Sequence, residues 1–188
     1  GAWTAKYSPG ALTLLAPADH HIADPAAFRA HVAKGAAAAA KGAIVAFGVK
    51  PGEAHTGYGY IEAGAPISDS VAEVAAFREK PDRQTAEHYL KGGRHYWNAV
   101  IFLFAPDAMA GELAAFAPAI AREAAAALGE ARIDGALCRL DRTRFAACPA
   151  DSIDYAVMEK TGRAAVVGPV DAGWSDIGAW TALPGGGG

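Results

Sequence analysis

Apolar runs that end at a proline, a glycine or a charged residue recur along this chain of 188 residues. One such run covers residues 12–16 and stops at a proline, and another covers residues 44–49. Between them, Asp24 and Pro25 are a typical N-cap and first-turn pair, and an alanine-rich stretch follows. The pattern predicts strand, helix and strand with short connections, which is a βαβ unit.

The middle of the chain predicts more strands. Residues 58–62 and 71–78 are expected to form strands that pair antiparallel across a loop rich in Gly, Pro, Ser and Asp. The remaining expected elements are a helix at 84–91, a strand at 99–104, helices at 106–116, 118–128 and 152–160, and a strand at 164–170. The predicted class is α/β, a mixed, mostly parallel sheet flanked by helices in a single domain over residues 1–188, with ligands at strand ends.

Composition excludes several functional classes. The net charge is −3, and acidic and basic residues are intermixed, so no electrostatic footprint for nucleic acid or an anionic membrane is present. The longest apolar stretches are shorter than a membrane span. Cys138 and Cys148 form no metal or redox motif, and no leader with a cleavage site is visible. We therefore expect a cytoplasmic protein that binds neither nucleic acid nor a membrane.

Two carboxylates are candidate metal ligands. Asp19 and Asp176 both follow strand-like apolar runs near opposite ends of the chain. A fold that aligns those runs would bring both carboxylates to one divalent cation. Mg²⁺ commonly takes only one or two protein carboxylates and leaves its other positions to water and substrate phosphates. The alternative is that Asp19 caps a turn and Asp176 caps the last helix.

Four other residues have the chemistry of a sugar-phosphate site. Gly59, at the start of a predicted strand, would allow a ligand to approach the backbone, or would mark a bulge. Glu79 suits a sugar hydroxyl and Lys80 suits a phosphate, and both could reach one ligand if Pro81 ends the pleat. The alternative is a solvated charge pair. Asn98 could read a further hydroxyl, or could be a turn residue.

Other candidate chemistry is weaker. The histidines lack the H-x-x-x-H spacing of a zinc site, and no G-x-S-x-G elbow or Cys–His context indicates a covalent nucleophile. Residues 152–160 are predicted to be a capped helix with an apolar face that includes Ile153, Ala156 and Val157. That pattern requires no functional explanation.

Taken in order, these short motifs resemble those of the sugar-nucleotide pyrophosphorylases, and most closely the bacterial mannose-1-phosphate guanylyltransferases. The similarity runs from about residue 12 to residue 183. It is carried by residues 15–20, 47–51, 56–62, 77–82, 97–98, 152–160 and 173–180. Single motifs of this kind are weak, but seven in register are specific.

The resemblance implies a nucleotide-diphospho-sugar transferase-like fold. It also implies transfer of a GMP unit from GTP to mannose 1-phosphate, which gives GDP-mannose and pyrophosphate. The residues that match the family's functional positions are Asp19 and Asp176 as Mg²⁺ ligands and catalytic residues, Gly59 and Glu79 as sugar-hydroxyl contacts, Lys80 as a contact to the sugar phosphate, and Asn98 as a mannose contact. Whether the protein is a homo-oligomer is left open.

The sequence also departs from the family pattern. The glycine-rich loop with its Arg and catalytic Lys belongs before residue 12 and is not found there, so we expect an N-terminally truncated domain that alone does not make GDP-mannose at an enzyme-like rate. Ala99 and Val100 stand where the family usually has Ser and Gly. We likewise expect no isomerase-like domain of the kind that some relatives carry.

Two alternatives to the guanylyltransferase prediction stay open. One is a non-catalytic homologue or subunit that binds a sugar phosphate or a partner. The other is a pyrophosphorylase for another pair of nucleotide and sugar. The sequence does not decide the base, because the base-reading segment of the family would lie in the part that is not found.

Overall fold

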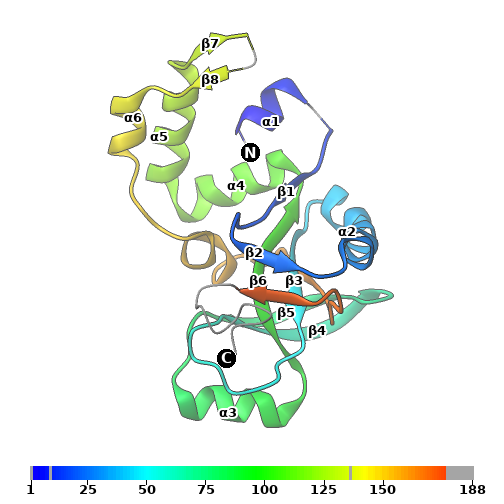
Figure 1. Cartoon of the computed structure of the whole chain (residues 1–188). Coiled ribbons are helices and arrows are strands. Elements are labelled where there is room, and N and C mark those ends of the chain that lie inside the picture. Colours follow the sequence, from blue (N-terminus) through cyan, green and yellow to red (C-terminus); the bar gives the residue numbers. More distant parts are fainter. Residues whose placement is uncertain (1, 9, 136, 177–188) are drawn as a thin grey trace, which may run out of the picture.

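The computed structural model describes residues 2–8, 10–135 and 137–176 (Figure 1). Its helices are α1 (Ala2–Tyr7), α2 (Pro25–Ala40), α3 (Arg83–Gly92), α4 (Pro106–Phe116), α5 (Pro118–Gly129), α6 (Arg142–Ala147) and the π-helical turn η1 (Asp154–Met158). Its strands are β1 (Thr13–Leu15), β2 (His20–Ile22), β3 (Ile44–Val49), β4 (Tyr60–Ser68), β5 (Val71–Arg78), β6 (His95–Phe104), β7 (Arg132–Asp134), β8 (Leu137–Arg139), β9 (Ala164–Val167) and β10 (Trp174–Asp176).

The main sheet has six strands in the order β1-β6-β3-β9-β5-β4, and β4 also pairs with β6. The α/β class and the mixed sheet are confirmed. The expectation of mostly parallel strands is wrong, because within the described residues only β3 and β9 pair parallel and the other pairs in this sheet are antiparallel. The apolar run of β3 reflects burial on both faces of the sheet, and burial alone does not encode strand direction.

The predicted βαβ unit is present in a modified form. β1 and β3 both run antiparallel to β6, which lies between them, so β1 and β3 are parallel to each other. Helix α2 connects them after the short strand β2. It begins where predicted, since the Asp24 side chain accepts hydrogen bonds from the backbone N–H groups of Ala26 and Ala27, each at 2.9 Å.

Most other predicted elements are confirmed, with shifted ends. The strands at 58–62 and 71–78 pair antiparallel as β4 and β5, although β4 continues to Ser68 through the expected loop. Helix α3 starts after the cap Asp82 and ends at Gly92, followed by the C-cap Gly93, which has a φ of +70°. The expected helix at 152–160 is instead the π-helical turn η1. The sequence pattern does not predict the short elements α1, α6, β2, β7, β8 and β10.

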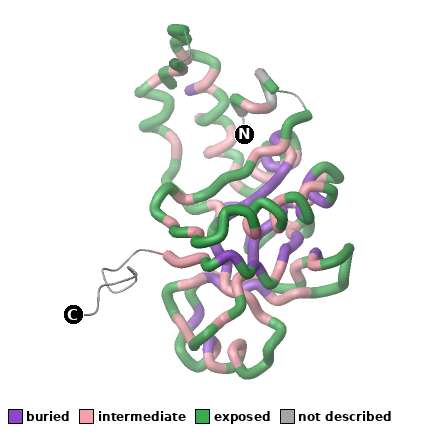
Figure 2. The backbone as a smooth tube through the Cα atoms, turned by 45° about the vertical axis from the view of Figure 1, so that its right-hand side comes forward, coloured by how far each residue is buried: buried purple, intermediate pink, exposed green. Residues whose placement is uncertain are grey.

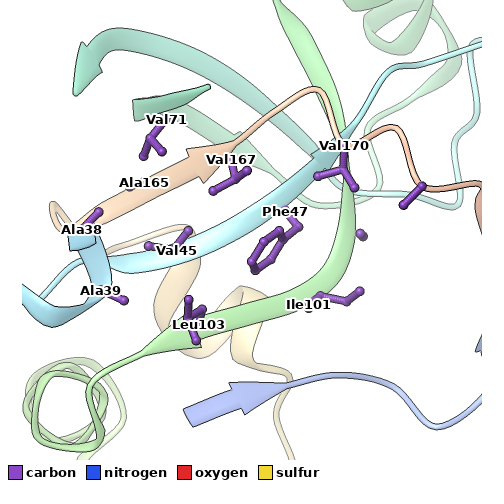
Figure 3. Packing of buried hydrophobic residues seen from close by; sticks show 12 residues of the cluster. Ala38, Ala39, Val45, Phe47, Val71, Ile101, Leu103, Ala165, Val167 and Val170 are labelled. Atoms are coloured by element: carbon purple, nitrogen blue, oxygen red, sulfur yellow. The ribbon is translucent and has the colours of Figure 1, made fainter. Parts of the chain in front are cut away.

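The sheet carries a hydrophobic cluster on each face. On the α2 face, Phe47 and Val167 pack with residues of that helix (Figure 3). On the other face, Phe102 and Met109 pack with the buried residues of η1. Figure 2 shows that the buried residues concentrate in the central strands, whereas the outer helices are mostly exposed. The core is therefore the central part of the sheet and the elements directly above and below it.

A second, two-stranded sheet joins β2 to β10. Its antiparallel register pairs Asp176 with His20 and Trp174 with Ile22. In Figure 1 this ribbon, blue and orange, crosses beside the main sheet. It brings together two segments that lie far apart in the sequence.

Gly35 lets α2 lie close to the sheet, and we predict that it resists replacement. A Cβ at Gly35 would lie 3.1 Å from Val45 Cγ1 and from Val167 Cγ2, whereas a Cβ at Gly111 on α4 would have no neighbour within 4 Å. Gly111→Ala should gain about 0.5–1 kcal/mol of stability through helix propensity. Gly35→Ala should lose about 1 kcal/mol, because overpacking outweighs that gain. Urea denaturation measures both, and an equal gain for the two variants would contradict the packing argument.

Candidate active site

Glu79 and Lys80 follow the last residue of β5 and turn toward each other. Lys80 has a φ of +43°, which interrupts the strand alternation, and its Nζ lies 3.3 Å from Glu79 Oε1. The side chain of Lys80 is 58% exposed, whereas that of Glu79 is only 9% exposed. The two groups therefore reach the same place, as predicted for a pleat that ends at Pro81. The alternative of a solvated charge pair is wrong for Glu79, because its side chain is almost fully buried.

Asn98 of β6 and Gly59, which directly precedes β4, lie next to this pair. The backbone N–H of Asn98 donates to the carbonyl oxygen of Gly59 at 2.8 Å. A Cβ at Gly59 would collide with Glu79 Oε2 and would lie 3.3 Å from Asn98 Cβ and 3.6 Å from Asn98 Nδ2. The absence of a side chain at Gly59 therefore permits this close approach. The structure brings all four predicted sugar-site residues together.

Asn98 is a buried strand residue, so its alternative as a turn residue is wrong. It lies within β6, is 1% exposed, and donates from Nδ2 to Asp154 Oδ1 at 2.9 Å. Its Oδ1 accepts the backbone N–H of Val100 at 3.0 Å. The amide is held at both ends, because a buried polar group requires partners.

The site is rich in hydrogen-bond acceptors. Glu79 Oε2 is buried and has no hydrogen-bond partner among the described residues, and the Glu79 backbone N–H donates to Glu159 Oε1 at 3.1 Å. Burial, and then the neighbouring charge of Asp154, raise the pKa of Glu79. Burial also raises the pKa of Asp154, although its hydrogen bond from Asn98 opposes the shift. An unpartnered buried carboxylate oxygen next to an exposed ammonium suits a ligand with hydroxyl donors and an anionic group.

The structure brings the backbones of Asp19 and Asp176 together. Asp176 is the last residue of β10 and pairs with His20, and Asp19 lies in the bend directly before His20. Asp19 therefore precedes β2 rather than ending a strand of the main sheet. The helix that Asp176 would cap in the alternative interpretation lies outside the described residues. A cation shared by both carboxylates stays a prediction.

Aromatic side chains connect the two parts of the site. Tyr58 packs against Trp97 and Trp174, with ring centroids 5.1 and 5.7 Å apart, respectively. Trp174 Nε1 donates to His20 Nδ1 at 3.1 Å and thus ties β10 to β2. Burial, and then the nearby charge of Asp176, raise the pKa of Tyr58. Tyr58 directly precedes Gly59, and Trp97 directly precedes Asn98. The aromatic cluster therefore holds the two-stranded β2–β10 sheet, with Asp176 at its end, beside the sugar-site residues.

Comparison with protein families decides the class. The model of a family described as "Nucleotidyl transferase" matches residues 1–185. The chain belongs to this nucleotidyl transferase family. Curated relatives named as mannose-1-phosphate guanylyltransferases confirm the similarity that the motifs predict.

This family member is 50% identical over 172 residues to the xanthan biosynthesis protein XanB of Xanthomonas campestris pv. campestris (strain B100). It is 45% identical over 184 residues to a mannose-1-phosphate guanylyltransferase of Escherichia coli (strain K12). These matches cover 92% and 95% of this chain but only 36% and 38% of the relatives. The chain therefore spans somewhat more than a third of the length of these curated relatives.

Solved structures confirm the fold. A protein from Thermus thermophilus, named mannose-1-phosphate geranyltransferase, superimposes with a TM-score of 0.84 at 34% identity, covering 97% of this chain and 51% of that one. A protein from Helicobacter pylori, named mannose-6-phosphate isomerase, gives 0.81 at 29% identity, with 93% and 68% covered. No helix among the described residues of this nucleotidyl transferase is long and apolar enough to cross a membrane.

Sequence reasoning missed Asp154 and Glu159. The pattern at 152–160 predicts a capped helix with an apolar face, yet η1 buries Asp154 with the apolar residues and directs it to Asn98. The available signal was an acidic residue between Ile153 and Ala156, within the apolar face itself. Charged residues are seldom buried without a partner, so such a position indicates a specific contact.

The raised pKa of Glu79 predicts how stability depends on pH. A carboxyl whose folded-state pKa lies above its ordinary value of 4.5 stabilises the fold fully at lower pH, and this contribution is lost as pH rises through the folded-state pKa. Glu79→Gln should remove that loss and raise Tm by about 2–4 °C near pH 7. Little difference from the unmodified chain is expected below pH 4.5.

The matched control is Glu73→Gln, an exposed carboxylate on the same strand, which should leave the pH profile unchanged. Thermal unfolding followed by circular dichroism between about pH 4 and pH 8 measures all three proteins. A Glu79→Gln curve parallel to that of the unmodified chain would show that Glu79 is not destabilised by its burial.

Proposed function

We propose that this chain forms the sugar-phosphate and metal-binding part of a mannose-1-phosphate guanylyltransferase. The enzyme would transfer a GMP unit from GTP to mannose 1-phosphate and release pyrophosphate. The single observation that carries the proposal is the convergence of Asn98 in β6, Gly59 directly before β4, and the adjacent Glu79 and Lys80 after β5 on one place. The relatives named as mannose-1-phosphate guanylyltransferases support the choice of nucleotide and sugar.

The chemistry of the side chains supports recognition of a sugar phosphate. Glu79 Oε2 is a buried acceptor without a partner among the described residues, and a sugar hydroxyl would supply the missing donor. Asn98 has one Nδ2 hydrogen left after its bond to Asp154, and this hydrogen can donate to a hydroxyl oxygen. Lys80 is exposed beside them and suits the phosphate group.

Asp19 and Asp176 fit Mg²⁺ in their donor chemistry. Both are hard-oxygen ligands, the β2–β10 register brings their backbones together, and Mg²⁺ needs only one or two protein carboxylates when phosphates fill other positions. Asp19 and Asp176 would hold the ion. When bound, Mg²⁺ would neutralise negative charge on the phosphate groups.

The proposed reaction is an in-line displacement at phosphorus. A phosphate oxygen of mannose 1-phosphate forms a bond to the α-phosphorus of GTP, while the bond from that phosphorus to the bridging oxygen of the departing pyrophosphate breaks. Such transfers need positioning and charge neutralisation more than covalent catalysis by the protein. Glu79, Asn98 and Gly59 would position the sugar, and Lys80 would offset phosphate charge.

Two measurements test the proposal. Calorimetric titration of the chain with mannose 1-phosphate and Mg²⁺ should show binding that weakens at least about tenfold in Asp19→Asn or Asp176→Asn, because each removes a charged ligand. The exposed Asp171→Asn is the control and should bind normally. Pyrophosphate release from GTP by the full-length protein should fall with the same variants. Binding without any pyrophosphate release by the full-length protein would favour a non-catalytic sugar-phosphate-binding subunit.

Gly59 supplies a sharper test of the sugar site. Gly59→Ala would place a methyl group against the Glu79 carboxylate, which must then shift from its position in the site. Affinity for mannose 1-phosphate should fall about tenfold or more, since one charge-assisted hydrogen bond would be lost. Gly52→Ala lies in a loop where a Cβ would meet nothing within 4 Å, and it should bind like the unmodified chain. Equal affinity for mannose 1-phosphate in the two variants would show that the sugar does not bind next to Gly59.

A further inference from the structure

The turn η1 and the residue after it support the sugar site through two acidic side chains. Asp154, which is 5% exposed, accepts a hydrogen bond from Asn98 Nδ2 at 2.9 Å. Glu159 accepts the backbone N–H of Glu79 at 3.1 Å. Each acid of this segment thus holds one residue of the site, although neither is among the residues assigned to the sugar or the metal. These contacts suggest that the segment acts on the ligand through its neighbours.

The Asn98 amide has one favourable orientation. Its Oδ1 faces the backbone N–H of Val100, a donor, and its Nδ2 faces the Asp154 carboxylate, an acceptor. A flipped amide would place Oδ1 against the carboxylate and Nδ2 against the N–H group, so both contacts would become repulsive. Val100 has a φ of +55°, which is uncommon for a β-branched residue. The positive φ of Val100 occurs at the residue whose backbone N–H donates to Asn98 Oδ1.

Burying the Asp154 carboxylate costs folding free energy. The direction of its hydrogen bond with Asn98 gives a reason for a carboxylate at this position. Asp154 lies among apolar residues of η1, and this burial disfavours its charge more than the hydrogen bond from Asn98 and the nearby charge of Lys80 favour it, so the pKa of Asp154 is raised. An apolar residue of similar volume would fill the same space at lower cost. A carboxylate, which is acceptor-only when ionised, differs from such a residue by dictating which atom of Asn98 faces it.

We propose that Asp154 is a positioning residue that sets the donor direction of Asn98 and thereby the selectivity of the site for sugar configuration. This inference rests on the proposed function, in which Asn98 contacts the sugar. With Asp154 in place, Asn98 offers its second Nδ2 hydrogen, and Glu79 Oε2 offers an acceptor nearby. A hydroxyl held between this donor and this acceptor is recognised by its position on the ring. Without Asp154, only the backbone N–H of Val100 favours this orientation of the Asn98 amide, so the flipped amide becomes more populated.

The test compares Asp154→Ala, Asp154→Asn and Val157→Ala. Val157 is fully buried in the same turn, so its variant loosens the turn but keeps Asp154. Calorimetry with mannose 1-phosphate and its 2-epimer glucose 1-phosphate gives affinity and selectivity for each protein. In Asp154→Ala, affinity for mannose 1-phosphate should fall about tenfold, and its preference over glucose 1-phosphate should fall several-fold. Asp154→Asn should fall less, because its amide oxygen still accepts a hydrogen bond.

Val157→Ala should lower thermal stability without changing the ratio of the two affinities. If Asp154→Ala does not fold, Asp154→Leu decides, since it fills a similar volume and offers Asn98 no acceptor. An unchanged ratio in the folded Asp154 variants, or an equal change in Val157→Ala, would overturn the positioning role. If the unmodified chain binds neither sugar phosphate, the proposed function fails, and this outcome is distinct from binding with unchanged selectivity.

Discussion

The register of β6 is the constraint on which the site depends. Tyr96 lies against Gly48 of β3 and against Gly168 after β9, and a Cβ at either glycine would come within 3 Å of its side chain. This close packing holds β6 against β3 where their register shifts between Ala46 and Gly48. The next two residues, Trp97 and Asn98, are thereby fixed opposite Val49 and Gly48. Trp97 also pairs with Tyr60, so β6 sets the position of β4 and of Gly59.

The local elements could be predicted from the sequence, but their pairing could not. Asp24 and Pro25 mark the start of α2, and Gly93 marks the end of α3, because caps and left-handed residues act over a few positions. Strand direction depends on partners far along the chain. The apolar run of β3 is equally compatible with parallel and antiparallel neighbours, and for that reason the antiparallel insertion of β6 was missed.

In the candidate site, too, contacts between neighbouring residues could be predicted from the sequence, and contacts between distant residues could not. The grouping of Glu79 with Lys80 follows from adjacent positions and a strand end, whereas their meeting with Asn98 was inferred from the family resemblance. Asp154 was missed because its neighbours in sequence are apolar and its partner lies 56 positions earlier. The structure adds to the family assignment a network in which Asp154 and Glu159 hold the residues proposed to touch the sugar.

The hydrogen bond from Trp174 to His20 joins residues separated by 154 positions. Ordering so long a segment carries a loop-closure entropy that short-range contacts avoid, and long-range pairings of this kind slow folding. During synthesis, His20 leaves the ribosome well before Trp174, so β2, which follows Asp19, has to wait for its partner strand β10, which carries Asp176. The central strand β9 also emerges late, because its residues 164–167 pair with residues 44–47 of β3. We therefore expect the main sheet and the β2–β10 sheet to be completed late and close together in time.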